Sequence, residues 1–462
     1  MKNCIFIINK KILILFMKTN YCRQFVLLSI VFLMIFFIFF RPSHALCEEA
    51  LSQNLEIDGL PDQPGFNIME EIDMLYNNLH IGTLEIKPSY ELIETYDDNV
   101  FNTFEDETAD FYTLHQFNIG LLSPLSDYSL VHFDYNAAIY EYMRIQDLNH
   151  VNQSLEGAID FNFANDFKLS FSDRIKRSVI PPGVQRRFFG AIIDDEIPIE
   201  DQGPNVFVDR RTIITNTASF DLDFPDFFPN LDFSIHYTNR DVSYQEEEFE
   251  DSDSNVDTLS AIVEYQYPFL PIKISSGFLY SIVRYDSSPN RDSIKKNVPF
   301  DIEWKITPKN ELYLKTHYKT SNYGNHSTLE NFEGFETILG NRYFVTPVSS
   351  IEVFAERSVK EQRSTDNNSY FFTAIGLRYT WELNRFEASV EVNYFNLEFF
   401  ERNDALGIVE EVNGISANLN IIYNPQDWWF AEFDYGYNRR DNTITLGDLT
   451  KNTVSLSAGL NF

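Results

Sequence analysis

The stretch Leu84-Glu85-Ile86-Lys87-Pro88-Ser89-Tyr90-Glu91-Leu92 alternates apolar and polar residues without a break. A period of two is the pattern of a β-strand with one apolar face and one polar face. Immediately upstream, Ile68, Ile72, Leu75 and Leu79 recur at helical spacing instead. The change of period places the start of a β-domain near residue 82.

The same alternation recurs to the end of the chain. In Val151–Phe163, for example, Leu155, Ile159 and Phe161 fall on one face, while Glu156 and Asp160 fall on the other. Comparable segments lie at 109–121, 129–139, 167–175, 213–224, 231–242, 256–266, 272–284, 298–306, 311–319, 334–345, 351–358, 370–381, 385–396, 411–422, 428–438 and 452–462. We therefore predict about 18 strands, with 16 also compatible.

Connections between these segments alternate in length. Short ones such as Glu382 to Asn384 are followed by long polar ones such as 397–410. Short turns at one end and long loops at the other are typical of a transmembrane antiparallel up-and-down β-barrel. Many segments reach ten residues, enough for a tilted membrane strand and more than most soluble strands have. The competing fold is a secreted soluble β-protein such as a propeller or a sandwich.

Composition excludes several classes of protein. The 462 residues carry 69 acidic and 36 basic side chains, a net charge of -33 that opposes nucleic-acid binding. The 43 Phe and 25 Tyr are too many for a disordered acidic chain. Mean hydropathy is -0.25, and a single stretch is long and apolar enough for a helical span, which opposes a helical membrane protein.

That stretch, Phe25–Phe40, follows basic residues and precedes Ser43 and Ala45, small residues suited to a cut before Leu46. This order predicts a signal peptide over 1–45, with Met17 as an alternative start. A retained membrane anchor is the other interpretation, and a lipidated Cys47 is disfavoured by the large Leu46. Cleavage leaves Cys47 as the lone cysteine, which excludes an intrachain disulfide.

Two further segments complete the predicted organisation. Residues 46–81 form a periplasmic N-terminal leader with a short amphipathic helix, which either packs under the main domain or docks a partner. Residues 82–462 form the barrel. The last segment alternates from Val454 to Phe462, and a C-terminal Phe resembles the assembly signal of bacterial outer-membrane proteins.

The polar faces of the strands should line the barrel lumen. The acidic candidates for the lining are Asp134, Glu156, Asp160, Asp221, Asp223, Asp232, Asp301, Glu303, Glu387, Glu391, Glu432 and Asp434. Acidic residues outnumber basic ones about two to one on these faces, which predicts a preference for cations. A mixed, unselective lumen is the alternative.

Other polar groups give weaker signals. The run Glu246–Asp253 is acidic, but Val256 stands where an EF-hand requires Gly, so a solvated loop is favoured over a calcium site. Arg186 and Arg187 belong to the longest loop, 176–211, for which an ordinary external loop is favoured over an inward constriction or a contact with lipopolysaccharide phosphates. The pairs His132 with Asp134 and Ser234 with His236 lack a third converging group, so an enzyme is disfavoured. No cofactor or metal is predicted.

The segment Glu94-Thr95-Tyr96-Asp97-Asp98-Asn99, followed by Val100-Phe101, resembles the first strand of the β-barrel porin family of the second type. Members are outer-membrane proteins of Gram-negative bacteria, often associated with exopolysaccharide export. The resemblance covers roughly 82–462 and implies a barrel and a link to polysaccharide, without catalytic residues. From the residues alone, Asp97, Asp98 and Asn99 are turn formers at the external end of the first strand.

Together these observations predict a porin-like barrel of the bacterial outer membrane, which passes solutes passively or exports exopolysaccharide through an acidic lumen. The alternative is a structural or surface-interaction barrel with a blocked lumen, and an outer-membrane hydrolase is less favoured. The expected partners are outer-membrane lipid and lipopolysaccharide, the barrel assembly machinery, and exopolysaccharide or its export components. No nucleic-acid partner is expected.

Overall fold

A computed structural model describes residues 79–101, 107–163, 167–180, 211–246, 253–287, 289–323, 331–362, 368–403, 408–442 and 448–461. All of these belong to the larger of two compact units, Ile68–Phe462. The predicted signal peptide, the Met17 start, the leader up to residue 78, and Phe462 lie outside the described residues.

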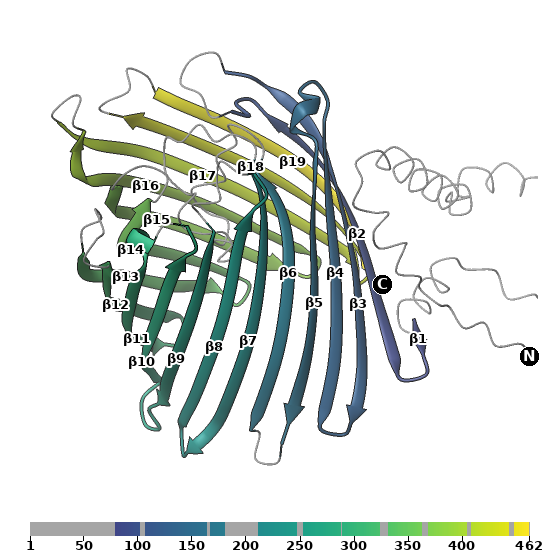
Figure 1. The fold of residues 1–462 in the computed structure, drawn as a ribbon, viewed down its shortest axis with the longest axis vertical. Coiled ribbons are helices and arrows are strands. Elements are labelled where there is room, and N and C mark those ends of the chain that lie inside the picture. Colours follow the sequence, from purple (N-terminus) through teal and green to yellow (C-terminus); the bar gives the residue numbers. More distant parts are fainter. Residues whose placement is uncertain are drawn as a thin grey trace, which may run out of the picture. The chain divides into compact units, whose positions relative to one another are not determined.

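The described chain is built from antiparallel strands (Figure 1). They are β1 (His80–Ile81), β2 (Leu84–Asp97), β3 (Asp110–Ser126), β4 (Ser129–Tyr142), β5 (His150–Asn162), β6 (Lys168–Ile180), β7 (Arg211–Phe228), β8 (Leu231–Tyr244), β9 (Ser254–Gln266), β10 (Ile272–Tyr285), β11 (Ser293–Thr307), β12 (Asn310–Tyr323), β13 (Phe332–Thr346), β14 (Ser349–Gln362), β15 (Asn368–Leu383), β16 (Phe386–Asn403), β17 (Ile408–Gln426), β18 (Trp429–Asn442) and β19 (Asp448–Asn461). Two short 3-10 turns lie at Gln146–Leu148 and Pro289–Arg291.

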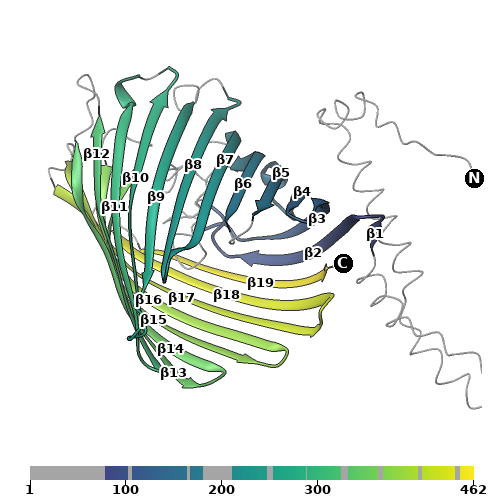
Figure 2. The same ribbon diagram turned by 90° about the horizontal axis from the view of Figure 1, so that it is seen from below.

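The sheet closes on itself. Each strand from β2 to β19 pairs with the next, and β19 pairs back with β2 from Asn461 opposite Ser89 to Thr453 opposite Asp97. Figure 2 shows β2 and β19 side by side. The short β1 adds to the edge of β2 through His80 and Ile81. The predicted closed barrel of 18 antiparallel strands is confirmed.

Tight turns connect the strands at one end of the barrel, which we call the short-turn end. Two residues connect β7 to β8 and β15 to β16, and in both turns an asparagine, Asn230 or Asn384, has positive φ. Asparagine tolerates this left-handed conformation better than most residues, which suits tight hairpin turns. The longer connections lie at the opposite, long-loop end. Both the start of β2 and the end of β19 fall at the short-turn end.

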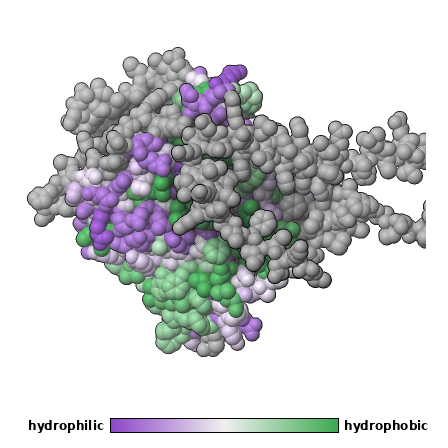
Figure 3. All heavy atoms as spheres, turned by 45° about the vertical axis from the view of Figure 1, so that its right-hand side comes forward, coloured by the Kyte–Doolittle hydropathy of each residue, from purple (hydrophilic) through white to green (hydrophobic). Residues whose placement is uncertain are grey.

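The outward face is apolar over the middle of the strands. Phe133, Leu155, Leu377 and Leu456 are 50%, 51%, 49% and 59% exposed, unlike core residues of a soluble protein. Figure 3 shows hydrophobic side chains gathered in a patch on one side of the molecule, bordered by hydrophilic ones. An apolar outer band on a closed sheet leaves no backbone edge in hydrocarbon, as a membrane barrel requires.

Four outward-facing tyrosines mark where this band ends toward the long loops. Their hydroxyls donate to polar residues on the neighbouring strand: Tyr237 to Asp257 at 2.7 Å, Tyr318 to Glu333 at 3.1 Å, Tyr394 to Asn413 at 3.0 Å and Tyr435 to Asn452 at 2.9 Å. Amphipathic rings of this kind concentrate at membrane interfaces. At the short-turn end, Tyr128 and Phe228 are exposed, as in an aromatic girdle, whereas Trp428 is buried.

The strands extend beyond the predicted segments. From β2 to β19 they run from 13 to 19 residues, whereas about 9 to 11 cross a bilayer. The segment predicted at 298–306 is in fact Ser293–Thr307, and the one predicted at 109–121 is Asp110–Ser126. Beyond the apolar band the strict alternation of the sequence fades, although the hydrogen-bonded ladder continues.

No helix among the described residues is both long and apolar enough to cross a bilayer.

Candidate functional site

The candidate site is the inner wall of the barrel. Cross-strand pairing fixes which side chains share a face, because directly opposed residues point the same way. One row, for instance, runs from Lys87 through Gly120, Asp134 and Glu156 to Arg174. Following the pairing round the sheet places all twelve predicted acidic residues on this inward face, opposite the exposed apolar side chains.

On β4 to β8 the inward acids bind neighbouring polar groups. Asp160 accepts a 2.6 Å hydrogen bond from Ser170 and lies 3.4 Å from Nδ1 of His132. Asp221 lies 2.6 Å from Nδ1 of His236. The two sets adjoin, because Ser170 is directly opposite Asp221. Since Ser170 donates to a carboxylate and not to an imidazole, no activated nucleophile is formed here.

The pairs considered from the sequence share the inward face, as expected. Each histidine contacts an acid on the neighbouring strand: His132 contacts Asp160, and His236 contacts Asp221. Asp134 instead lies opposite Glu156, whose carboxylate pairs with Arg174 at 2.5 Å. The sequence pairs therefore do not form a catalytic set.

Strands β12 to β14 carry the first half of a larger network. Glu352 is only 5% exposed, and its Oε1 accepts a 2.6 Å hydrogen bond from the Tyr313 hydroxyl. Its Oε2 accepts from Nη2 of Arg342 at 3.2 Å. A carboxylate this buried is stable only because such partners replace its hydration.

Strands β15 and β16 complete the network. Arg378 donates from Nε at 2.6 Å to Oε2 of Glu391, and its Nη1 lies 3.5 Å from Oε2 of Glu352. Asn393 donates to the other oxygen of Glu391 at 2.6 Å. Two guanidinium groups thus balance two carboxylates across five strands. We refer to Tyr313, Arg342, Glu352, Arg378 and Glu391 as the five-strand network.

The seam between β18, β19 and β2 is acidic. Glu91, Glu432 and Asp434 face inward there, and Asn420 donates one hydrogen bond to Glu432 and a 2.9 Å bond to Asp434. Within the described ranges, no Lys, Arg or His forms an ion pair with these three carboxylates. Negative charge is therefore concentrated on this part of the wall.

The other predicted lumen residues lie in mixed surroundings. Asp301 is 3.5 Å from Nε2 of His317, and Glu303 faces Tyr313 across the ladder. Asp232 accepts a 2.7 Å bond from the Asp226 amide, so it shapes a turn. Inward Asp223 faces Lys168, and Glu387 faces Glu382.

The short family-like segment closes the barrel. Thr95, 2% exposed, bonds Ser455 at 2.9 Å, and Asp97 pairs with Lys451 at 2.8 Å. Asp98 accepts two hydrogen bonds from Asn452, at 2.7 and 2.6 Å. These contacts tie the first long strand, β2, to the last, β19.

The remaining residues of the segment Glu94–Asn99 hold the end of β2 in place. Glu94 accepts from Thr113 at 2.9 Å, and Tyr96 packs on Phe111 with ring centroids 4.8 Å apart. Asn99 is fully buried and its amide donates to Asp97 at 3.0 Å, as in an Asx turn. The contacts of these residues within the barrel therefore explain the segment, and no ligand is needed.

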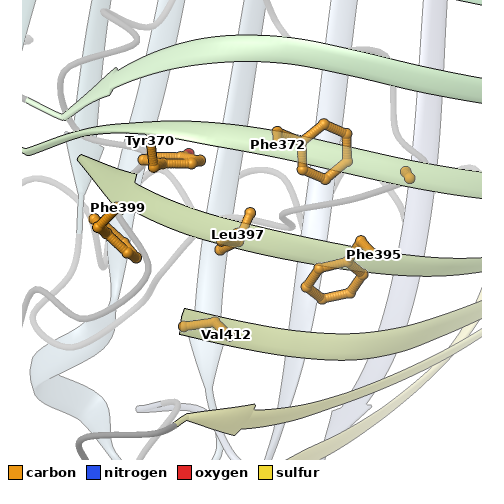
Figure 4. Close-up of a cluster of buried hydrophobic side chains, with 7 residues drawn as sticks. Tyr370, Phe372, Phe395, Leu397, Phe399 and Val412 are labelled. Atoms are coloured by element: carbon orange, nitrogen blue, oxygen red, sulfur yellow. The ribbon is translucent and has the colours of Figure 1, made fainter. Parts of the chain in front are cut away.

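Buried apolar side chains occupy the inner wall toward the long-loop end. Tyr370 and Phe372 of β15 lie beside Phe395, Leu397 and Phe399 of β16, with Ala374 and Val412 (Figure 4). Phe395 and Leu397 are 0% exposed. These side chains therefore pack against one another on the inner wall of β15 to β17 and are shielded from solvent.

Sequence reasoning missed the basic and aromatic parts of this wall. Arg342 and Arg378 were not assigned inward, although each alternates with outward residues such as Tyr343 and Leu377. The inward Phe354 was overlooked because apolar residues were assigned to the lipid face. Arg385 lies in the turn between β15 and β16, outside the strands that form the wall.

Several predicted loop features lie outside the described residues, among them Arg186, Arg187 and 247–252. At the end of the acidic run, Asp253 accepts a 2.7 Å bond from the Tyr244 amide, and Asn255 donates to Asp241. Both side chains thus hold strand ends together. In the described part of the chain, no cluster of three or more His, Cys, Asp or Glu is arranged to hold a metal ion.

Comparison with known proteins supports the architecture. No protein-family model matches the chain, and neither does any curated protein sequence. Among solved structures, the chain is similar to the outer membrane protein OpdK of Pseudomonas aeruginosa, with 10% identity and a TM-score of 0.51 over 82% of this chain and 99% of that one. A second structure of that protein, titled OccK1 (OpdK), gives 8% identity and 0.50 over the same shares.

OccAB3 of Acinetobacter baumannii is 9% identical, with a TM-score of 0.49 over 83% of this chain and all of that one. At such low identity, the similarity to OpdK concerns the fold alone. This similarity in fold agrees with the observed pairing of the strands. The chain folds as an 18-strand antiparallel barrel of the outer-membrane type.

Proposed function

We propose that this chain is a non-enzymatic, porin-like barrel of the bacterial outer membrane that passes solutes passively along its inner wall. The observation that carries the proposal is the sidedness of the strands: ionisable groups face inward around the sheet, while large apolar side chains are exposed outward. Charged groups that face away from lipid need water or paired partners, and a hydrated inner wall supplies water to the carboxylates that have no ion pair.

The acidic seam gives the proposed pore its selectivity. Glu91, Glu432 and Asp434 have no ion-pair partner in the described part of the chain, so their field extends into the lumen. Rings or patches of carboxylates attract cations and repel anions. The balanced five-strand network adds no net charge. The pore should therefore favour cations.

Planar bilayers test the proposal directly. Purified, refolded protein should insert as stepwise increases in conductance. Folded protein that inserts but never conducts would refute solute passage.

A structural barrel with a blocked lumen is the second candidate, because the fully buried Phe395 and Leu397 show that part of the inner wall is shielded from solvent. The same recordings separate the two, since a blocked barrel stays closed at every voltage. Exopolysaccharide export is the finer form of the main proposal, and its support is the sequence resemblance at Glu94–Asn99. Membership of the outer membrane further implies contact with lipopolysaccharide and insertion by the barrel assembly machinery.

A further inference from the structure

Aromatic side chains are unevenly distributed over the inner wall. Along β2 to β11, inward aromatic residues of the described segments are confined to the long-loop ends: Tyr112, Tyr140, Tyr142, Tyr244 and Tyr285. Farther down the wall they occur on β12 to β18 instead, as Tyr313, Phe344, Phe354 and Phe430. Away from the long-loop ends, the inward aromatic residues therefore lie on one side of the lumen, on β12 to β18.

Two of these rings lie in one row. Tyr313 is directly opposite Gly340, Gly340 is opposite Phe354, and Phe354 is opposite Gly376. A β-carbon on Gly340 would overlap the Tyr313 ring, and one on Gly376 would overlap the Phe354 ring. The far end of each ring therefore lies over a glycine of the neighbouring strand, and both residues are half-buried on the inner wall. Strand spacing puts the two rings about 10 Å apart.

Hydrogen-bonding groups surround these rings. The guanidinium carbon of Arg378 lies 5.8 Å from the centre of the Phe354 ring, and the Tyr313 hydroxyl belongs to the five-strand network. The side chains of Arg342 and Arg378 are 39% and 40% exposed, while Glu352 and Glu391 beneath them are 7% and 12% exposed. A guanidinium has five N–H groups. In the described part of the chain, Arg342 donates to Glu352 only from Nη2, so its other N–H groups can donate to a solute.

The chemistry of this wall selects one class of solute. Flat apolar faces bordered by fixed donors and acceptors match a sugar ring, which has C–H groups on its faces and hydroxyls at its edge. The negative face of an aromatic ring attracts such C–H groups. Within the five-strand network two guanidiniums and two carboxylates cancel, and Lys315 lies 6.0 Å from the centre of the Tyr313 ring as a further cation beside these rings. An anion would have to displace Glu352 or Glu391 from its partners.

We propose that Tyr313 and Phe354, together with the five-strand network, bind neutral sugar chains on the inner wall of β12 to β16. This inference rests on the proposed function, because it names the class of solute for the same lumen. A linear chain of pyranose rings is long enough to lie on both aromatic faces at once.

The test uses full-length protein in planar bilayers with maltohexaose, cellopentaose and chitohexaose as probes. At least one should block the ion current in a saturable manner, while polyethylene glycol of similar size should not. Phe354→Leu should weaken the apparent affinity roughly tenfold by removing the stacking face. The control is Phe430→Leu, which removes a ring lying over Gly459 outside the network and should leave the affinity unchanged.

Two results would overturn the sugar site: a conducting wild type that none of the three sugars blocks, or equal effects of Phe354→Leu and Phe430→Leu. Failure of the proposed function is distinguishable. If folded protein does not conduct, equilibrium dialysis of labelled sugars against the detergent-solubilised protein still measures binding. Binding that Phe354→Leu weakens would then support the site without a pore, and no binding would refute it.

Discussion

Asp98 and Asn452 fasten the two ends of the sheet together, although 354 positions separate them in the chain. The Asn452 amide donates to Asp98 Oδ1 at 2.7 Å, and its side-chain Nδ2 donates to Asp98 Oδ2 at 2.6 Å. The Asp98 amide returns a 3.2 Å bond to the Asn452 carbonyl. Closure of the barrel therefore ends in a side-chain clasp at the long-loop end.

Removing the hydrogen bonds between Asp98 and Asn452 should lower the free energy of unfolding of the barrel. Asp98→Ala removes both acceptors and leaves the half-buried amide groups of Asn452 without partners, which costs about 1–3 kcal/mol. Urea unfolding of the protein in phospholipid vesicles, followed by tryptophan fluorescence, measures the loss. Asp127→Ala, in an exposed turn, is the control and should change stability by less than about 0.5 kcal/mol. Equal effects at both sites would argue against the clasp.

The rings that lie over glycines should make those glycines hard to replace. Gly376→Ala puts a methyl group against the Phe354 ring and Asn393 Oδ1, and overpacking of this kind costs about 1–3 kcal/mol. The same substitution should cost less in a Phe354→Leu background, because the ring is then absent. Unfolding free energies of the four proteins in this cycle provide the measurement. An identical cost in both backgrounds would show that the ring is not the cause.

Arg378 holds two carboxylates on different strands and should be a stability residue. Arg378→Gln leaves Glu391 and Glu352 with fewer partners, and we expect a loss of about 2 kcal/mol. Adding Glu391→Gln should recover part of that loss, because a neutral amide needs no cation beside it. Denaturant midpoints of the single and double variants test this. A double variant less stable than Arg378→Gln would contradict the explanation.

The acidic seam should set ion preference. Neutralising Glu91, Glu432 and Asp434 together, as E91Q, E432Q and D434N, removes the unpaired inward charge while preserving size. The ratio of cation to anion permeability should then fall severalfold. Glu352→Gln, whose charge is balanced by Arg342 and Arg378, should change that ratio much less. A larger effect from Glu352→Gln would show that the seam does not face the ion path.

The parts of the fold that the sequence predicts are those in which one face of a strand contacts lipid. Segments such as Val151–Phe163 were found because hydrocarbon on one side and water on the other impose a strict period of two. The ends of strands, as in Ser293–Thr307, were missed because no lipid constrains the side chains there. The acids of the inner wall shared a face for the same reason: a charge facing lipid is too costly.

The five-strand network on the inner wall could not be predicted from the sequence. Its members lie on five strands, and Tyr313 and Glu352 are 39 residues apart, so their contact depends on the register of two intervening pairings. Phe354 was hidden because hydrophobicity alone assigns an aromatic ring to lipid. The glycines opposite Tyr313 and Phe354 are the local signal, since an aromatic residue paired with glycine across strands can lie inward and flat.

Reversal potential across a planar bilayer, measured with wild-type protein under a potassium chloride gradient, tests the central claim most directly. If the charged inner wall is the solute path, the protein conducts and the reversal potential takes the sign of a cation-selective pore. A folded, inserted barrel that carries no current, or one that prefers chloride, would contradict the account.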